Sequence, residues 1–192
     1  AHGQQVVRHF YTMMIERPET PAEPQLPDGI SIRPMRYPDE FEKVILADKD
    51  SFQDHYGYVD MPMADLLPLW THWGEGDPPF DANLWFVAVD DATCDFAGVC
   101  LNSPIWHNDP TVGYVDTLGV TRAYRRKGLG MALLQHSFKA LWALGKQKIT
   151  LGVDASSITG ATRLYEKVGM SEEESYATYF LELRPGEDLS TQ

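Results

Sequence analysis

The chain has 192 residues, with 16 Lys and Arg against 28 Asp and Glu, a formal net charge of −12 with its six His neutral, and 43% hydrophobic residues. This composition is that of a globular protein, and the length suits one core-forming domain with an appendage, so the disordered and fibrous classes are excluded. The acidic excess argues against broad binding of nucleic acid or of an anionic membrane, since both depend on an extended basic surface. It suits a cationic partner.

The two cysteines, Cys94 and Cys100, are too few for a disulfide framework and lack CxxC spacing, so we expect reduced thiols. No apolar stretch approaches the roughly 18 residues of a membrane helix, and the N-terminus lacks a basic region followed by an apolar run. We therefore expect a soluble, cytoplasmic protein. The chain begins with Ala1 in place of Met, which fits processing, an expression remnant or a fragment of a longer protein.

Part of the sequence pattern of the first 17 residues recurs near the C-terminus. Val6–Ile15 is rich in β-branched and aromatic residues, which predicts a strand, and the prolines of residues 18–29 predict a semi-rigid linker. At one constant offset, Tyr176, Thr178, Phe180, Leu181 and Glu182 correspond to Phe10, Thr12, Met14, Ile15 and Glu16. We therefore predict that residues 1–17 are the closing strand of a preceding, similar domain. The alternative is chance likeness between two amphipathic strands, which share a period of two.

One domain is expected over residues 30–185, followed by a polar tail at 186–192. Runs of apolar and β-branched residues predict strands at 30–33, 84–89, 96–101, 112–120, 148–153 and 176–183. Apolar residues near the helical period predict helices from Pro38 to about 52, from about 63 to 73, at 130–144 and at 160–168. Thr159 is placed to cap the start of the last helix and Gly169 its end. This alternation indicates an α/β fold whose mixed sheet carries helices on both faces.

A basic cluster interrupts the acidic chain. Arg122, Arg125, Arg126 and Lys127 fall within six positions, directly before Gly128-Leu129-Gly130 and the start of a predicted helix. Glycine lets the backbone approach a ligand closely, and the free N–H groups and dipole at a helix start favour phosphate. The alternative is a solvated basic loop with a glycine turn. Neither a Walker loop nor a GxGxxG fingerprint is present, so the common nucleotide motifs are excluded.

Three segments in fixed order extend this signal. The loop Arg125-Arg126-Lys127-Gly128-Leu129-Gly130 is preceded by the strand 113–120 and followed by Ala161-Thr-Arg-Leu-Tyr-Glu-Lys-Val-Gly-Met170. Together they resemble the GNAT superfamily of acyl-CoA N-acyltransferases, over about residues 30–183. The leader strand and Asp54-His-Tyr-Gly57 make the chain most similar to the C-terminal domain of a tandem, mycothiol-synthase-like GNAT protein.

The resemblance implies a mixed, mostly antiparallel central sheet and direct transfer of an acetyl group from acetyl-CoA to an amine, without an acyl-enzyme. By position in the motifs, the residues implied to contact the co-substrate are Leu118, Gly119, Val120, Arg125, Arg126, Lys127, Gly128, Leu129, Gly130, Met131 and Ser157. The backbone of the first three would pair with the pantetheine arm like an added strand, and the N–H groups of residues 126–131 would hold the pyrophosphate. Ser157, with Asp154 and Ser156 nearby, stands where the family commonly has Asn, which predicts weakened rather than abolished binding.

Two residues are implied to move protons. Tyr165, in the family's LY position, would protonate the departing thiolate, which a phenol with a pKa near 10 can do at neutral pH. An alkylamine costs roughly 4–5 kcal/mol to deprotonate at pH 7, so a relay is needed. Asp116 occupies the position where the family often has Glu or Asp; the alternative is that it only orders the strand or binds a cationic substrate.

The acceptor side is implied to include Asp54, His55 and Tyr56, beside Tyr58, in the loop between the first two helices. Trp106 and His107 are a second candidate pair, and plain surface positions are the alternative for all of them. No HExxH, CxxC or GxSxG spacing occurs, so neither a metal site nor a Ser nucleophile is expected.

We thus expect an acetyl-CoA-dependent N-acetyltransferase acting on a small primary amine. The alternative is a non-catalytic GNAT domain that binds acyl-CoA or only packs against a tandem twin. Expected partners are the amine and either a tandem GNAT-like domain or a second copy joined through the N-terminal strand.

Overall fold

The computed structural model describes residues 5–17, 19–75, 80–157, 160–184, 186 and 189–190. The expected helix cap Thr159 and much of the expected tail lie outside these residues.

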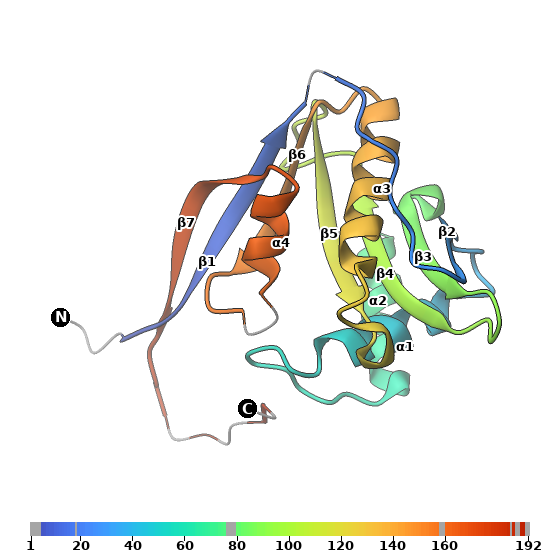
Figure 1. The fold of residues 1–192 in the computed structure, drawn as a ribbon. Coiled ribbons are helices and arrows are strands. Elements are labelled where there is room, and N and C mark those ends of the chain that lie inside the picture. Colours follow the sequence, from blue (N-terminus) through green and yellow to red (C-terminus); the bar gives the residue numbers. More distant parts are fainter. Residues whose placement is uncertain are drawn as a thin grey trace.

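Among the described residues, seven strands form one mixed sheet in the order β2-β3-β4-β5-β6-β1-β7 (Figure 1). In chain order they are β1 (Gln5–Glu16), β2 (Ile30–Pro34), β3 (Trp85–Asp90), β4 (Phe96–Ser103), β5 (Val112–Val120), β6 (Lys148–Asp154) and β7 (Ser171–Phe180). Every pairing is antiparallel except that of β5 with β6. The expected mixed, mostly antiparallel sheet is confirmed.

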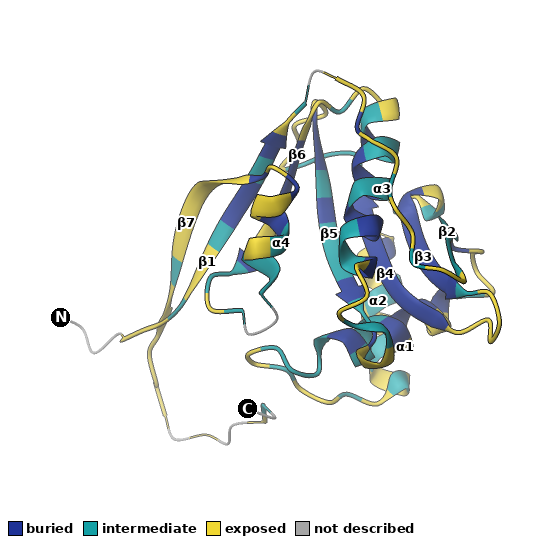
Figure 2. Ribbon diagram, viewed as in Figure 1, coloured by how far each residue is buried: buried dark blue, intermediate teal, exposed yellow. Residues whose placement is uncertain are grey.

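In the part of the chain that the structure describes, four α-helices flank the sheet: α1 (Phe41–Phe52), α2 (Met63–Gly74), α3 (Leu129–Ala143) and α4 (Ala161–Lys167). The apolar residues of α3 pack with Phe86, Ala88 and Cys100 in one core cluster, and those of α1 pack with Val87, Val99 and Leu101 in another. Because alternate strand residues point to opposite faces, α1 and α3 cover opposite faces of β3 and β4, which are buried (Figure 2). Among the described residues, no helix has the length and apolar character needed to cross a membrane.

The N-terminal segment is a strand of this domain's own sheet. β1 lies between β6 and β7, antiparallel to both, with Met13 opposite Leu151 and Phe10 opposite Tyr176. Met13 is buried, and its carbonyl accepts a hydrogen bond from Thr150 Oγ1 at 2.9 Å. β1 therefore belongs to the core that this domain needs. That a similar domain precedes it stays a prediction.

Two elements have boundaries that differ by three residues or more from those expected. The closing strand runs over Ser171–Phe180 in place of 176–183, because its extent follows its pairing with β1. Helix α1 begins at Phe41 in place of Pro38, since the Glu40 carboxylate accepts hydrogen bonds from Arg33 and from the Arg36 N–H and holds the preceding residues in a turn.

Candidate active site

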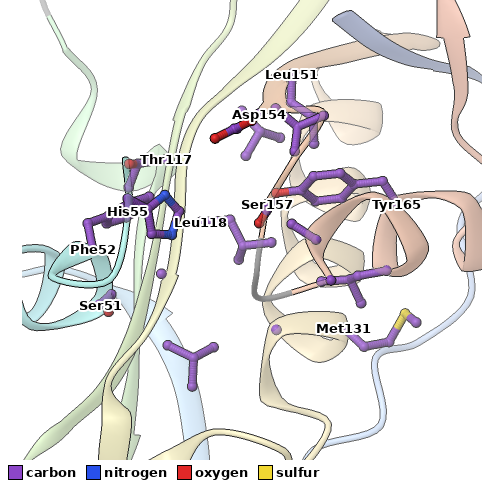
Figure 3. Close-up of a pocket in the computed structure, with 18 of the residues that line it drawn as sticks. Ser51, Phe52, His55, Thr117, Leu118, Met131, Leu151, Asp154, Ser157 and Tyr165 are labelled. Carbon is purple, nitrogen blue, oxygen red and sulfur yellow. The ribbon is translucent and has the colours of Figure 1, made fainter. Parts of the chain in front are cut away.

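A cleft of about 720 Å³ opens where β5 and β6 separate. The parallel pairing of these strands ends at Val115 opposite Leu151, while β5 continues to Val120 and β6 to Asp154. On its other side β5 stays paired with β4, apart from a bulge at Asp116, so its edge from Leu118 to Val120 faces the cleft. The start of α3, the helix α4 and the end of α1 supply further walls (Figure 3).

The glycine loop brings a helix start to the cleft. Gly128 has φ +81° and Arg126 φ +63°, so the backbone curls before α3 begins at Leu129. A Cβ at Gly128 would meet nothing within 4 Å, which means that backbone conformation and not space calls for glycine there. The first N–H groups of α3 lack partners within the helix, and the residues from Gly128 to Met131 line the cleft. This geometry suits an anion.

The arginines before this loop hold it to α1. Arg125 Nη1 binds Asp54 Oδ2 at 2.6 Å, while its other nitrogens donate to the carbonyls of Ser51 at 3.0 Å and Val120 at 3.3 Å. Arg122 binds the second oxygen of Asp54 at 2.5 Å, and the two arginines lower the pKa of that carboxyl. Asp54, expected on the acceptor side, therefore ties the helix-connecting loop to the arginines that precede the glycine loop. Lys127 is not a wall residue, and its ammonium lies 5.0 Å from the Tyr124 ring centroid.

Next to Asp54, His55 lines the cleft. Its ring lies 4.4 Å from that of Phe52, and burial together with nearby Arg125 lowers the pKa of His55, which favours a neutral imidazole. Figure 3 shows His55 on the wall that faces Tyr165 across the cleft.

Two other expected acceptor residues lie outside the walls of the cleft. Tyr56 is half exposed, with the Arg8 guanidinium 4.4 Å from its ring centroid. The Trp106 ring stacks on that of Tyr114, with 4.0 Å between the ring centroids, and the centroid of the His107 ring lies 3.9 Å from that of Trp106.

The two expected proton carriers line the same cleft. Asp116 sits at the bulge of β5 and accepts a hydrogen bond from Ser103 Oγ at 2.7 Å, and burial raises its pKa to about 6. Tyr165 is buried, and its ring extends from α4 into the cleft, where Ser157 is another wall residue (Figure 3). Burial raises the pKa of Tyr165, so it keeps its proton at neutral pH.

Sequence reasoning missed the contribution of β1. Phe10 lines the cleft, and Arg8 donates from both Nε and Nη2 to Asp154 Oδ2, at 2.9 and 2.8 Å. The charged Arg8 within a run rich in β-branched and aromatic residues is the signal that the sequence offers. It could not show which sheet receives that strand.

A metal site would need several His, Cys, Asp or Glu side chains close together. Within the described ranges, no three His, Cys, Asp or Glu side chains come together as a group that could hold an ion.

Comparison with known families adds to this geometry. Residues 45–170 match the model of the Acetyltransferase (GNAT) family, which is more than half of the chain. The chain belongs to the GNAT acetyltransferase family. It is 31% identical over 166 residues to a mycothiol acetyltransferase of Salinispora tropica, covering 83% of this chain and 50% of that relative. A mycothiol acetyltransferase of Renibacterium salmoninarum is also 31% identical, over 80% of this chain and 44% of the relative.

This chain also covers little more than half of two solved GNAT structures. A GCN5-related N-acetyltransferase from Sphaerobacter thermophilus superposes with a TM-score of 0.79 and 30% identity, covering all of this chain and 56% of that one. A tandem GNAT protein from the clavulanic acid biosynthesis pathway shares the fold at a TM-score of 0.70 and 14% identity. This GNAT chain thus spans about half the length of the relatives it matches.

Proposed function

We propose that this GNAT domain transfers an acetyl group from acetyl-CoA directly to a primary amine of a small cationic substrate, in a ternary complex. The observation that carries the proposal is that one cleft is lined by a helix start with free N–H groups, an open strand edge, and the side chains of Asp116 and Tyr165. Strand β5 carries the open edge and Asp116, α3 supplies the helix start, and α4 carries Tyr165.

The residues present fit acetyl-CoA. The edge of β5 from Leu118 to Val120, beyond the last pairing with β6, offers backbone groups to an extended pantetheine arm. The N–H groups at the start of α3 suit the pyrophosphate. When bound, acetyl-CoA supplies an activated thioester carbonyl.

The protein's own groups then handle two protons. The ionised Asp116 accepts a proton from the ammonium, directly or through a water, so that the neutral nitrogen forms the new N–C bond. As the C–S bond breaks, Tyr165 donates its proton to the thiolate. The nitrogen gives up a second proton once the N–C bond has formed, and this proton replaces the one that Tyr165 gave to the thiolate. The proton taken by Asp116 passes to solvent, so one proton is released for each acetyl group transferred.

The acidic net charge supports a cationic acceptor, and the length of the relatives supports a partner domain. A net charge of −12 favours a cationic acceptor, and relatives about twice as long favour a second GNAT-like domain beside this one. A second copy joined through the N-terminal strand is the other arrangement. An exposed free Cys94 accords with a cytoplasmic location.

The competing proposal is a GNAT domain that binds acyl-CoA without turnover. Ser157, where the family commonly has Asn, and the half-length coverage favour it. Calorimetric titration with acetyl-CoA, followed by a thiol-release assay against a panel of amines, separates the two. Amine-dependent thiol release supports the transferase. Tight binding of acetyl-CoA without thiol release across the panel supports the non-catalytic acyl-CoA-binding domain.

A further inference from the structure

A second, smaller cavity of about 130 Å³ lies beside α1 and α2, the two helices close together in Figure 1. Its walls are Ile45, Asp48, Lys49, Phe52, Tyr58, Val59, Leu66 and Trp70. Phe52 also lines the large cleft, so the two spaces adjoin at that ring. The cavity is large enough for the end of a small substrate, because one water occupies only about 30 Å³.

The carboxylate of Asp48 lines this cavity. Within the described part of the chain no cationic side chain pairs with it, and its one hydrogen bond comes from Thr117 Oγ1, 3.2 Å from Asp48 Oδ1. Lys49 is adjacent, but its ammonium is held by Asp60 at 2.7 Å and by the Met61 carbonyl at 2.6 Å. Burial accordingly raises the pKa of Asp48 to about 7.

Three aromatic residues share the cavity with this carboxylate: Phe52, Tyr58 and Trp70. Aromatic faces attract cations through their quadrupole, and a carboxylate adds a charge-assisted hydrogen bond. An apolar ligand would leave the carboxylate buried without compensation. The set of walls therefore suits an ammonium group at the end of an alkyl chain.

We propose that Asp48, Phe52, Tyr58 and Trp70 form a subsite for a second ammonium group of the acceptor, so that the preferred substrates are diamines. This rests on the proposed acetyl transfer. Thr117 links the two spaces, since it lines the large cleft and donates to Asp48. One amine of the acceptor is placed near Asp116 for reaction, and the other is held beyond Phe52.

The test compares 1,5-diaminopentane with 5-amino-1-pentanol, which has the same reach and one charge fewer. Calorimetric titration at pH 8, where Asp48 is ionised, should show the diamine binding the wild-type chain about tenfold or more tightly than the amino alcohol. Asp48→Asn should bring the two affinities together. Asp65→Asn, on the exposed side of α2, makes the same change in net charge and should keep the preference.

Equal affinity of the wild-type chain for the two probes overturns the subsite, and this result needs no variant. If Asp48→Asn and Asp65→Asn weaken diamine binding equally, the subsite is also overturned, because equal losses of affinity indicate a general attraction of cations to an acidic protein. Acetyl-CoA affinity, measured in each variant, reports whether the fold is intact. If monoamines are acetylated without a diamine preference, the subsite fails and the proposed function stands; if the diamine binds through Asp48 and no amine is acetylated, the proposed function fails.

Discussion

Replacing Asp116 by Asn should lower activity and raise stability at the same time. A general base contributes about 10²–10⁴-fold to a rate, so kcat at pH 7 should fall by at least about 10²-fold. In the wild-type chain kcat should rise with pH through about 6, the raised pKa of Asp116, and the variant should lack that inflection. Asn can still accept the hydrogen bond from Ser103, so the bulge of β5 keeps its support.

The stability effect follows from linkage. Burial raises the carboxyl pKa of Asp116 from 3.8 to about 6, so the folded state holds this proton more tightly than the unfolded state does. Stability is therefore lost as pH rises from about 4 to 6, and the full difference corresponds to about 3 kcal/mol above that range. Asp116→Asn should recover about 1–3 kcal/mol at pH 8, a rise in Tm of roughly 2–10 °C, and little at pH 4.

Steady-state kinetics between pH 5 and 9, with thermal unfolding at pH 4 and 8, measures both effects. A misfolded variant would lose activity and stability together, so the opposite signs separate catalysis from folding. An unchanged pH profile would refute the role of Asp116 as base. A Tm that falls at pH 8 would refute the assignment of its raised pKa to burial.

Three further substitutions test the rest of the cleft. Tyr165→Phe should lower kcat by about 10²-fold or more while leaving the acetyl-CoA Kd from calorimetry unchanged; a weakened Kd would make Tyr165 a binding residue. Gly128→Glu should abolish acetyl-CoA binding in the same titration, whereas Gly145→Glu, at the same φ of +81° beyond the other end of α3, should not. Gly119→Ala should lower the free energy of unfolding in urea by about 1–3 kcal/mol, because its Cβ would lie 2.7 Å from Ser51 Cβ; unchanged stability would show that α1 shifts freely.

The order and type of the elements could be predicted because each is encoded locally. β5 was expected over residues 112–120 and occupies Val112–Val120, since its apolar run ends at turn residues on both sides. The position of β1 could not be predicted in this way. Its pattern shows that it is a strand, but the choice of β6 and β7 as neighbours depends on contacts across more than a hundred residues.

The candidate site was predictable where a motif fixes the backbone and less so where side chains meet across the fold. The glycine loop, apart from Lys127, and Tyr165 line one cleft, and their roles there stay predictions. Arg125 and Asp54 were given separate roles, while the structure pairs them, because a contact between residues 71 positions apart leaves no trace in spacing. Asp48 was overlooked although it shares the apolar face of α1 with Val44 and Phe52, and a carboxylate on such a face was a readable signal.

The central claim is that this domain transfers acetyl groups to amines. Its most direct test is to incubate the chain with acetyl-CoA and a broad amine panel and to follow free thiol together with the mass of the amine. We predict thiol release that requires an amine and yields one N-acetylated product per thiol. Tight binding of acetyl-CoA with neither thiol release nor acetylated product would contradict the account.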